Sequence, residues 1–126
     1  MKHLTNSRSI KDLQDLGGRV ALISGGAGFL GSVMASSLAE MGASLAIVDR
    51  NKDYGAQVCT HLKEKYACEI AFFEVDLSDD EQVAKVPHLV AERFGSFDIL
   101  VNAAAIVIDK FIEGWAVPFE GQKSSL

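Results

Sequence analysis

Residues 19–31 read RVALISGGAGFLG, and four of the last seven positions are glycine. The apolar run at 19–24 is rich in β-forming residues and predicts a strand. After the glycines, apolar residues recur at three- and four-residue steps, which predicts a helix over 28–41. Its expected buried face consists of Leu30, Val33, Met34, Leu38 and Met41. Gly42 follows, where a left-handed helix end favours glycine.

The alternation of strand and helix continues along the chain. Apolar runs predict strands at 44–49, 69–75 and 97–102. A second helix is expected after Asn51, to about Tyr66, and a third after Ser78, which has capping-box spacing with Glu81. The third helix has its apolar stripe at Val83, Val86, Val90 and Phe94, and Pro87 predicts a kink or break. This order predicts an α/β fold with parallel strands and right-handed crossovers.

Length and composition limit the class of protein. The 126 residues are 48% hydrophobic and 23% charged, which predicts one globular domain. The net charge of -5 and the lack of a basic cluster argue against nucleic-acid binding. No apolar run is long enough to span a membrane, and the polar start does not resemble a signal peptide, so a cytoplasmic location is expected. Neither the two cysteines nor the three histidines have metal-ligand spacing, so no metal site is expected.

The glycines after the first strand are suited to holding a phosphate. A helix N-terminus presents unpaired N–H groups and a partial positive charge. Gly25 would make the tight turn, Gly28 would admit a pyrophosphate, and Gly31 would let the helix lie close to the strand. A plain strand-to-helix turn is the alternative interpretation of the same residues.

A carboxylate at the end of the second strand strengthens the dinucleotide interpretation. Asp49 lies 18 residues after Gly31, near the position of an acid that binds an adenosine ribose. Its charge would repel a 2′-phosphate, which favours NAD over NADP. Arg50 is a counter-signal, because an arginine there can pair with that phosphate. A strand-ending turn residue is the alternative role for Asp49.

Four motifs together resemble the short-chain dehydrogenase/reductase family. They are SGGAGFLG at 24–31, Asp49, VDLS at 75–78 and DILVNAAA at 98–105. The resemblance extends from about residue 16 to residue 105. It implies a partial Rossmann-like doubly wound parallel sheet of strand order 3-2-1-4. It also implies the NAD(H)-binding N-terminal portion of an oxidoreductase that transfers hydride between a nicotinamide cofactor and a hydroxyl or carbonyl substrate.

The resemblance assigns roles to individual residues. The pyrophosphate loop would consist of Ser24, Gly25, Gly28, Phe29, Leu30 and Gly31. Asp49 and Arg50 would lie at the adenosine ribose, and Asp76 and Leu77 at the adenine ring. Asn102 would tie the central strands together, and Ala103 and Ala104 would run past the cofactor. The chain departs from the family motif at Ala103 and Ala105, and its GxxGxxG spacing is more usual in the extended branch of the family.

The family's catalytic tyrosine and lysine, four residues apart, have no counterpart here. Val58 follows Tyr54 by four residues, and Ile70 follows Tyr66 by four. No catalytic residue is therefore assigned, and a small-molecule substrate is expected only in a longer form. The predicted division is a lead-in at 1–16, a dinucleotide-binding domain at 17–110 and an irregular tail at 111–126.

The strand at 97–102 would leave an open apolar edge, which predicts an unstable monomer, self-association or a truncated piece of a longer enzyme. Truncation is the favoured interpretation. Two other functions stay open: a nucleotide-binding or interaction domain without chemistry, and a fragment of an extended-branch nucleotide-sugar epimerase or dehydratase.

Overall fold

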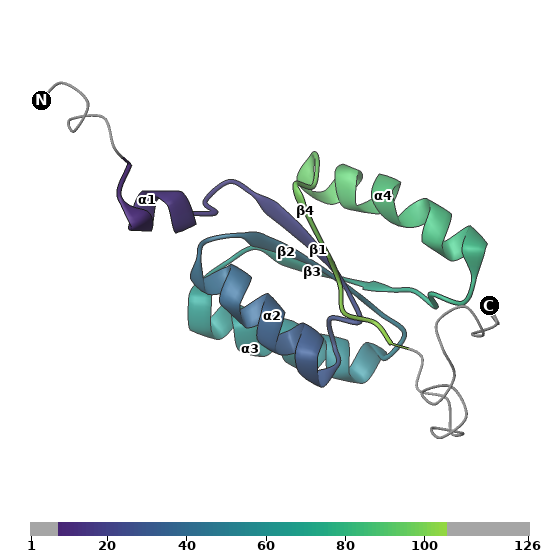
Figure 1. Cartoon of the computed structure of the whole chain (residues 1–126). Helices are drawn as coiled ribbons and strands as arrows, with labels where there is room; N and C mark the ends of the chain where they lie inside the picture. Colours follow the sequence, from purple (N-terminus) through teal and green to yellow (C-terminus); the bar gives the residue numbers. More distant parts are fainter. Residues whose placement is uncertain (1–7, 106–126) are drawn as a thin grey trace, which may run out of the picture.

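The computed structural model describes residues 8–105 and contains one parallel sheet between two layers of helices (Figure 1). The elements in chain order are α1 (Ile10–Gln14), β1 (Val20–Ser24), α2 (Phe29–Glu40), β2 (Ser44–Asp49), α3 (Lys52–Tyr66), β3 (Ile70–Glu74), α4 (Asp80–Phe94) and β4 (Ile99–Asn102). The sheet order is β3-β2-β1-β4. The predicted fold class and strand order are confirmed.

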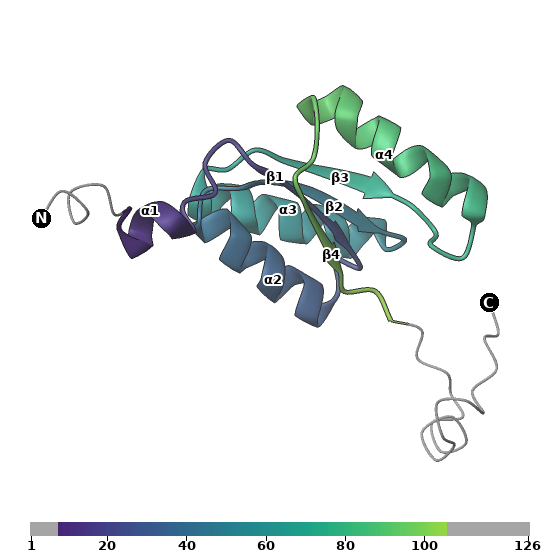
Figure 2. The ribbon, with the colours of Figure 1, turned by 45° about the horizontal axis from the view of Figure 1, so that its top comes forward.

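The strands end in register, so their carboxyl ends meet along one edge of the sheet (Figure 2). On β1, Ser24 is paired with Val48 of β2 on one side and with Asn102 of β4 on the other. Asp49, the last residue of β2, is paired with Glu74 of β3. The glycine turn, Asp49 and Asn102 therefore start from the same edge, although they are far apart in the sequence.

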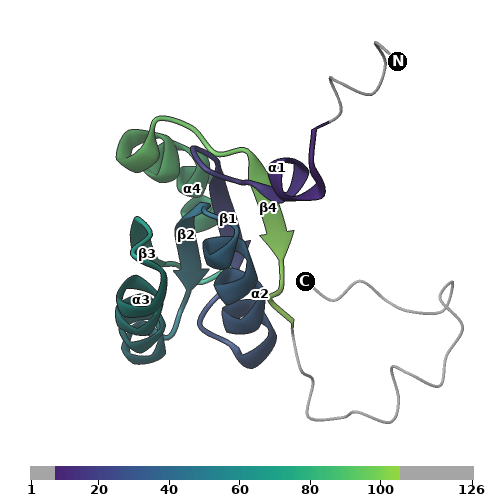
Figure 3. The ribbon, with the colours of Figure 1, turned by 90° about the vertical axis from the view of Figure 1, so that its left-hand side faces the viewer.

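Both faces of the sheet are covered, which explains the continuous apolar runs in β1 and β2. Figure 3 shows α2 and α3 on one side of the strands and α4 on the other. Along β1, Ala21 and Ile23 pack toward α2 and α3, whereas Val20 and Leu22 belong to the cluster that includes Val90 of α4. β4 lies at the edge of the sheet, and self-association through it stays a prediction.

The buried face of α2 differs from the prediction. Leu30, Val33 and Met34 are 63%, 54% and 42% exposed, whereas Leu38 packs partly buried against the core as predicted; the fully buried residues of the helix are Gly31, Ala35 and Ala39. A Cβ on Gly31 would lie 2.1 Å from the carbonyl oxygen of Gly25. The helix thus approaches the strands too closely for large side chains, and small residues form the contact instead.

The start of α4 also differs from the prediction. Asp79, not Ser78, is the N-cap, and its carboxylate accepts from the backbone N–H groups of Glu81 and Gln82. Ser78 instead donates its hydroxyl to Asp76. A carboxylate one residue later can cap the helix, which releases the serine for the preceding turn.

The helix does not break at Pro87, because α4 continues through it to Phe94, and a kink there stays a prediction. Pro87 has no N–H, so the helix lacks the hydrogen bond to the carbonyl of Val83, and both residues are exposed. Val86 and Val90 are buried as predicted, whereas Val83 is 38% exposed. Phe94 packs partly buried against the same cluster.

A short helix, α1, lies within the stretch predicted to be a polar lead-in. Ser9 and Asp12 form a capping box at its start. Leu16 then packs against the core and donates its N–H to the carbonyl of Met41. The end of the lead-in is thus attached to the domain. The predicted irregular tail, 111–126, lies outside the described residues.

Candidate functional site

The glycine turn is held against the end of β4. Gly25 has a φ of 68°, and a Cβ on it would lie 2.6 Å from the Cα and the N of Ala104. Ala103 donates its N–H to the carbonyl of Ser24 at 3.0 Å. Glycine is required at position 25 both for its backbone conformation and for this close approach. The structure therefore brings the predicted loop residues beside the predicted strand-four residues.

The backbone donors of the turn divide into two groups. Gly25 and Gly26 donate to the carbonyl of Val48, and Gly28 donates to that of Gly25. Ala27 donates to the carboxylate of Asp49. The N–H groups of residues 29–31 make no hydrogen bond to another described residue. These three donors are the first N–H groups of α2, and an anion bound at this helix end would accept hydrogen bonds from them.

Asp49 joins two segments at the carboxyl edge of the sheet. Its Oδ2 accepts from the N–H of Ala27 at 3.1 Å, and its Oδ1 accepts from the N–H of Asn51 at 3.0 Å. The first bond reaches the glycine turn, and the second reaches the N-cap of α3. Asp49 is half-buried, and a carboxylate oxygen has a further lone pair for another donor. The turn-residue role of Asp49 and a ligand-binding role are thus compatible.

Asp76 lies in the loop after β3, in a turn held by its own neighbours. Its Oδ1 accepts from both the N–H and the hydroxyl of Ser78, and these hydrogen bonds hold the pKa of the carboxyl below its ordinary value. The guanidinium of Arg50 lowers this pKa further by a smaller amount. Leu77, the residue after Asp76, is 38% exposed.

Asn102 and Ser24 link the ends of β4 and β1. Their side chains form a long hydrogen bond, with 3.4 Å between Ser24 Oγ and Asn102 Oδ1. The role of Asn102 as a tie between central strands stays a prediction. Phe29 and Leu30 lie at the start of α2 and are largely exposed, at 85% and 63%. The ring of Phe29 thus stands beside the turn and adds little to the core.

Sequence reasoning missed two residues that shape this edge. Ala27 is the partner of Asp49 within the turn. Gln82 of α4 accepts from the N–H of Asp76 and donates to Asp79. No local pattern identifies the Ala27 contact, because it joins residues 22 positions apart.

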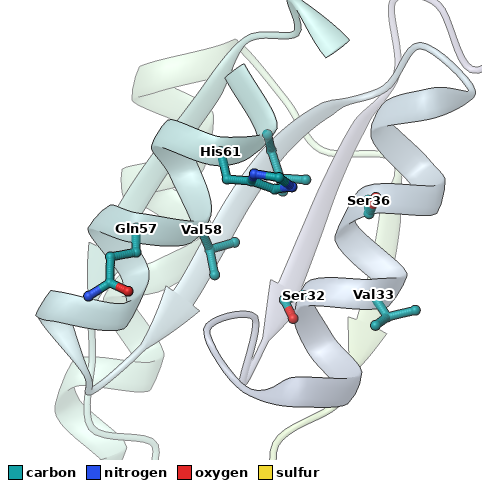
Figure 4. Close-up of a pocket in the computed structure, with 7 residues that line it drawn as sticks. Ser32, Val33, Ser36, Gln57, Val58 and His61 are labelled. Carbon is teal, nitrogen blue, oxygen red and sulfur yellow. The ribbon is translucent and has the colours of Figure 1, made fainter. Parts of the chain in front are cut away.

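An open groove of about 370 Å³ lies elsewhere, between α2 and α3 (Figure 4). It is lined by Ser32, Val33, Ser36, Gln57, Val58, His61 and Leu62. None of these is a predicted site residue. We place the candidate site at the strand ends, because the unpaired backbone donors, the carboxylates and the glycines meet there.

Residues 8–105 contain neither a metal-binding cluster nor a membrane-spanning helix. Among these residues no group of three or more histidine, cysteine or acidic side chains is arranged to hold a metal ion. Within the same part of the chain, no helix has the length and apolarity needed to cross a bilayer.

Comparison with known proteins decides the family. A family model described as short chain dehydrogenase matches residues 19–120. The chain belongs to this family. The family consists of oxidoreductases with a Rossmann fold that binds NAD or NADP, and the parallel sheet described above is the corresponding part of that fold.

Individual short-chain dehydrogenases are similar over most of this chain. Zerumbone synthase of Zingiber zerumbet is 37% identical over 99 residues, which are 78% of this chain and 36% of that protein. The 15-hydroxyprostaglandin dehydrogenase [NAD(+)] of Macaca fascicularis is 36% identical over 94 residues, 74% of this chain and 35% of its own length. The chain thus spans about a third of the length of these curated relatives.

Solved structures of short-chain dehydrogenases have the same fold. The L-sorbose reductase of Gluconobacter frateurii, crystallised with NADPH and L-sorbose, superposes with a TM-score of 0.73 at 31% identity, covering 85% of this chain and 40% of that one. An NAD+-bound xylitol dehydrogenase superposes with a TM-score of 0.65 at 29% identity, covering 68% and 32%. These relatives include both NAD+-bound and NADPH-bound proteins.

Proposed function

We propose that residues 17–105 form the NAD(H)-binding part of a short-chain dehydrogenase/reductase that moves hydride between a nicotinamide cofactor and a hydroxyl or carbonyl substrate. The observation that carries the proposal is the group of unpaired N–H donors at residues 29–31, beside glycines that lack a Cβ. Three adjacent donors at a helix N-terminus suit a pyrophosphate. The residues present therefore fit a dinucleotide, and its nicotinamide would supply the hydride chemistry.

The remaining predicted residues have roles around the same ligand. Asp49 would accept from the adenosine ribose through a lone pair that its two backbone bonds leave unused. Asp76 and Leu77 would border the adenine ring. Asn102, Ala103 and Ala104 would line the cofactor on the side of β4. No residue of this chain is proposed as catalytic, and the substrate would bind in a longer form of the protein.

Electrostatics at the ribose favours NAD over NADP. The carboxylate of Asp49 lies at the turn and would repel a 2′-phosphate. Arg50 is exposed, and it lowers the pKa of Asp76 only as a minor cause beside the hydrogen bonds from Ser78. Arg50 is nevertheless the residue that would bind that phosphate if NADP were preferred.

An extended-branch epimerase or dehydratase is the second candidate, because its glycine spacing, GxxGxxG, is found at Gly25, Gly28 and Gly31. Such an enzyme keeps its NAD through purification, so cofactor released by denaturing the purified protein would support this candidate. A nucleotide-binding or interaction domain without chemistry stays a third candidate. It predicts cofactor binding without turnover even in the longest natural form.

The test is a titration of the chain with NADH and with NADPH, followed by cofactor fluorescence. We expect saturable binding with NADH preferred. Gly28→Ala places a methyl group where the pyrophosphate would approach, while its Cβ would be 3.2 Å from the nearest atom, Gly25 O, so the fold is retained. This variant should bind NADH about tenfold or more weakly, whereas Ser37→Ala, on the exposed face of the same helix, should bind as the wild type does.

Each alternative outcome has a definite meaning. Preference for NADPH would show that Arg50, not Asp49, decides cofactor choice. No binding of either cofactor by the folded chain, with a native circular dichroism spectrum, would overturn the proposal that these residues form a cofactor site.

A further inference from the structure

Asp49 has a structural relationship to the glycine turn that a ribose-binding role does not require. Of the seven N–H groups at residues 25–31, the one at Ala27 is the only donor within the described turn that bonds to a side chain, and that side chain is Asp49. The N···O distance is 3.1 Å. The second oxygen of Asp49 accepts from Asn51, so the carboxylate is held on both sides.

This bond acts at the centre of the turn. Gly25 and Gly26 are held at its start by the carbonyl of Val48, and Gly28 is held at its end by that of Gly25. Ala27 is between them, and the N–H donors of residues 29–31 follow directly. Without an acceptor at Asp49, Ala27 would have no described partner, and the turn could rotate the donors away from a common target.

We propose that Asp49 is a positioning residue for the phosphate site: it fixes the turn through Ala27 and so orients the N–H groups of residues 29–31 toward one anion. The proposal rests on the proposed function and adds a second role to Asp49. The role is distinct from any contact with the ribose, and it extends to ligands that have no ribose at all.

Inorganic pyrophosphate is the probe that separates the two roles, because it has no ribose. Asp49→Asn and Asp49→Ala both remove the negative charge near the anion. By electrostatics alone, both variants would bind pyrophosphate equally, and more tightly than the wild type. They differ in whether an acceptor remains, because the single amide oxygen of Asn can still accept from Ala27, with its NH2 group then turned toward Asn51, whereas Ala has no acceptor.

The experiment measures pyrophosphate affinity of the wild type and both variants by chemical-shift titration of the amides of residues 28–31. Hydrogen exchange of the Ala27 amide is measured on the same samples. We expect Ala27 to be protected in the wild type and in Asp49→Asn but not in Asp49→Ala. Asp49→Asn should then bind pyrophosphate about fivefold tighter than Asp49→Ala, the effect of one retained hydrogen bond. If Asp49→Ala does not fold, Asp49→Ser replaces it. The serine side chain is one atom shorter than that of aspartate, so its hydroxyl does not reach the N–H of Ala27.

Equal pyrophosphate affinity of the Asn and Ala variants would overturn the proposal, and so would equal protection of Ala27 in both. Failure of the proposed function gives a different result, in which the folded wild type binds neither NADH nor pyrophosphate. In a third possible result, the wild type binds NADH and pyrophosphate, both variants bind NADH more weakly, and the two variants bind pyrophosphate equally. Asp49 would then have the ribose role alone.

Discussion

The contact between α2 and the glycine turn makes Gly31→Ala an informative substitution. Helix propensity alone predicts that it stabilises the protein, since Ala is favoured over Gly inside a helix by about 1 kcal/mol. The structure predicts the opposite sign. The new Cβ would be 2.1 Å from the carbonyl oxygen of Gly25, and real Cβ atoms essentially never lie closer than 3.0 Å to such an atom, so the helix or the turn must move by about 0.9 Å.

Overpacking of this kind costs about 3 kcal/mol, at the upper end of the usual range, because the obstacle is backbone and not a flexible side chain. Subtracting the propensity gain leaves a net loss of about 2 kcal/mol in the free energy of unfolding. This corresponds to a fall in Tm of roughly 8–15 °C for a domain of this size. Urea denaturation followed by circular dichroism would measure it.

Gly28→Ala is the matched control for this prediction. Its Cβ would be 3.2 Å from the same oxygen, and the backbone of Gly28 already has a negative φ of −75°. We expect a loss of about 1 kcal/mol or less, since Ala is a weaker N-cap than Gly. The reasoning is refuted if Gly31→Ala is no less stable than Gly28→Ala, or is more stable than the wild type.

Two further predictions concern the core and the pH dependence of stability. Val90→Ala removes two methyl groups from a side chain with no exposed surface, and it should lower the free energy of unfolding, measured by urea denaturation, by about 2–3 kcal/mol. Val33→Ala, at a 54% exposed position, should change it by less than about 0.5 kcal/mol. Equal effects would contradict the assignment of Val33 to the outer face of α2. Hydrogen bonds from the N–H of Val20 and from Arg19 lower the pKa of Asp98 from its ordinary value of 3.8. Because a lowered pKa contributes stability above the ordinary value and loses it in acid, the stability difference between wild type and Asp98→Asn should be constant near neutral pH and shrink below about pH 4, and a difference that grows in acid would contradict this.

The strands and most of the helices were predictable because their causes are local. β1 and β2 are covered on both faces, so they appear as continuous apolar runs, and Asn51 has the side chain of an N-cap. The face of α2 was not predictable from its large apolar residues. The contact depends on how closely the helix approaches Gly25, and that distance is set by the whole sheet.

The candidate site shows the same division. Glycines and a carboxylate at the expected spacing were visible in the sequence, and the roles of Asp76 and Asn102 came from the family resemblance. The bond from Ala27 to Asp49 and the contact of Gly25 with Ala104 join residues distant in the sequence. Their existence depends on strand order and register, which place these ends side by side.

The link between Ser24 and Asn102 joins residues 78 positions apart, and the glycine turn rests on Ala104 beyond it. The edge that would receive a dinucleotide is thus assembled from the ends of four strands, so a partly folded sheet would lack the complete site. Ligand affinity and folding free energy are then two measures of one equilibrium. A cofactor present at a hundred times its Kd would add about 2.7 kcal/mol to the free energy of unfolding, so the supply of dinucleotide in the cell would set how much of the chain is folded.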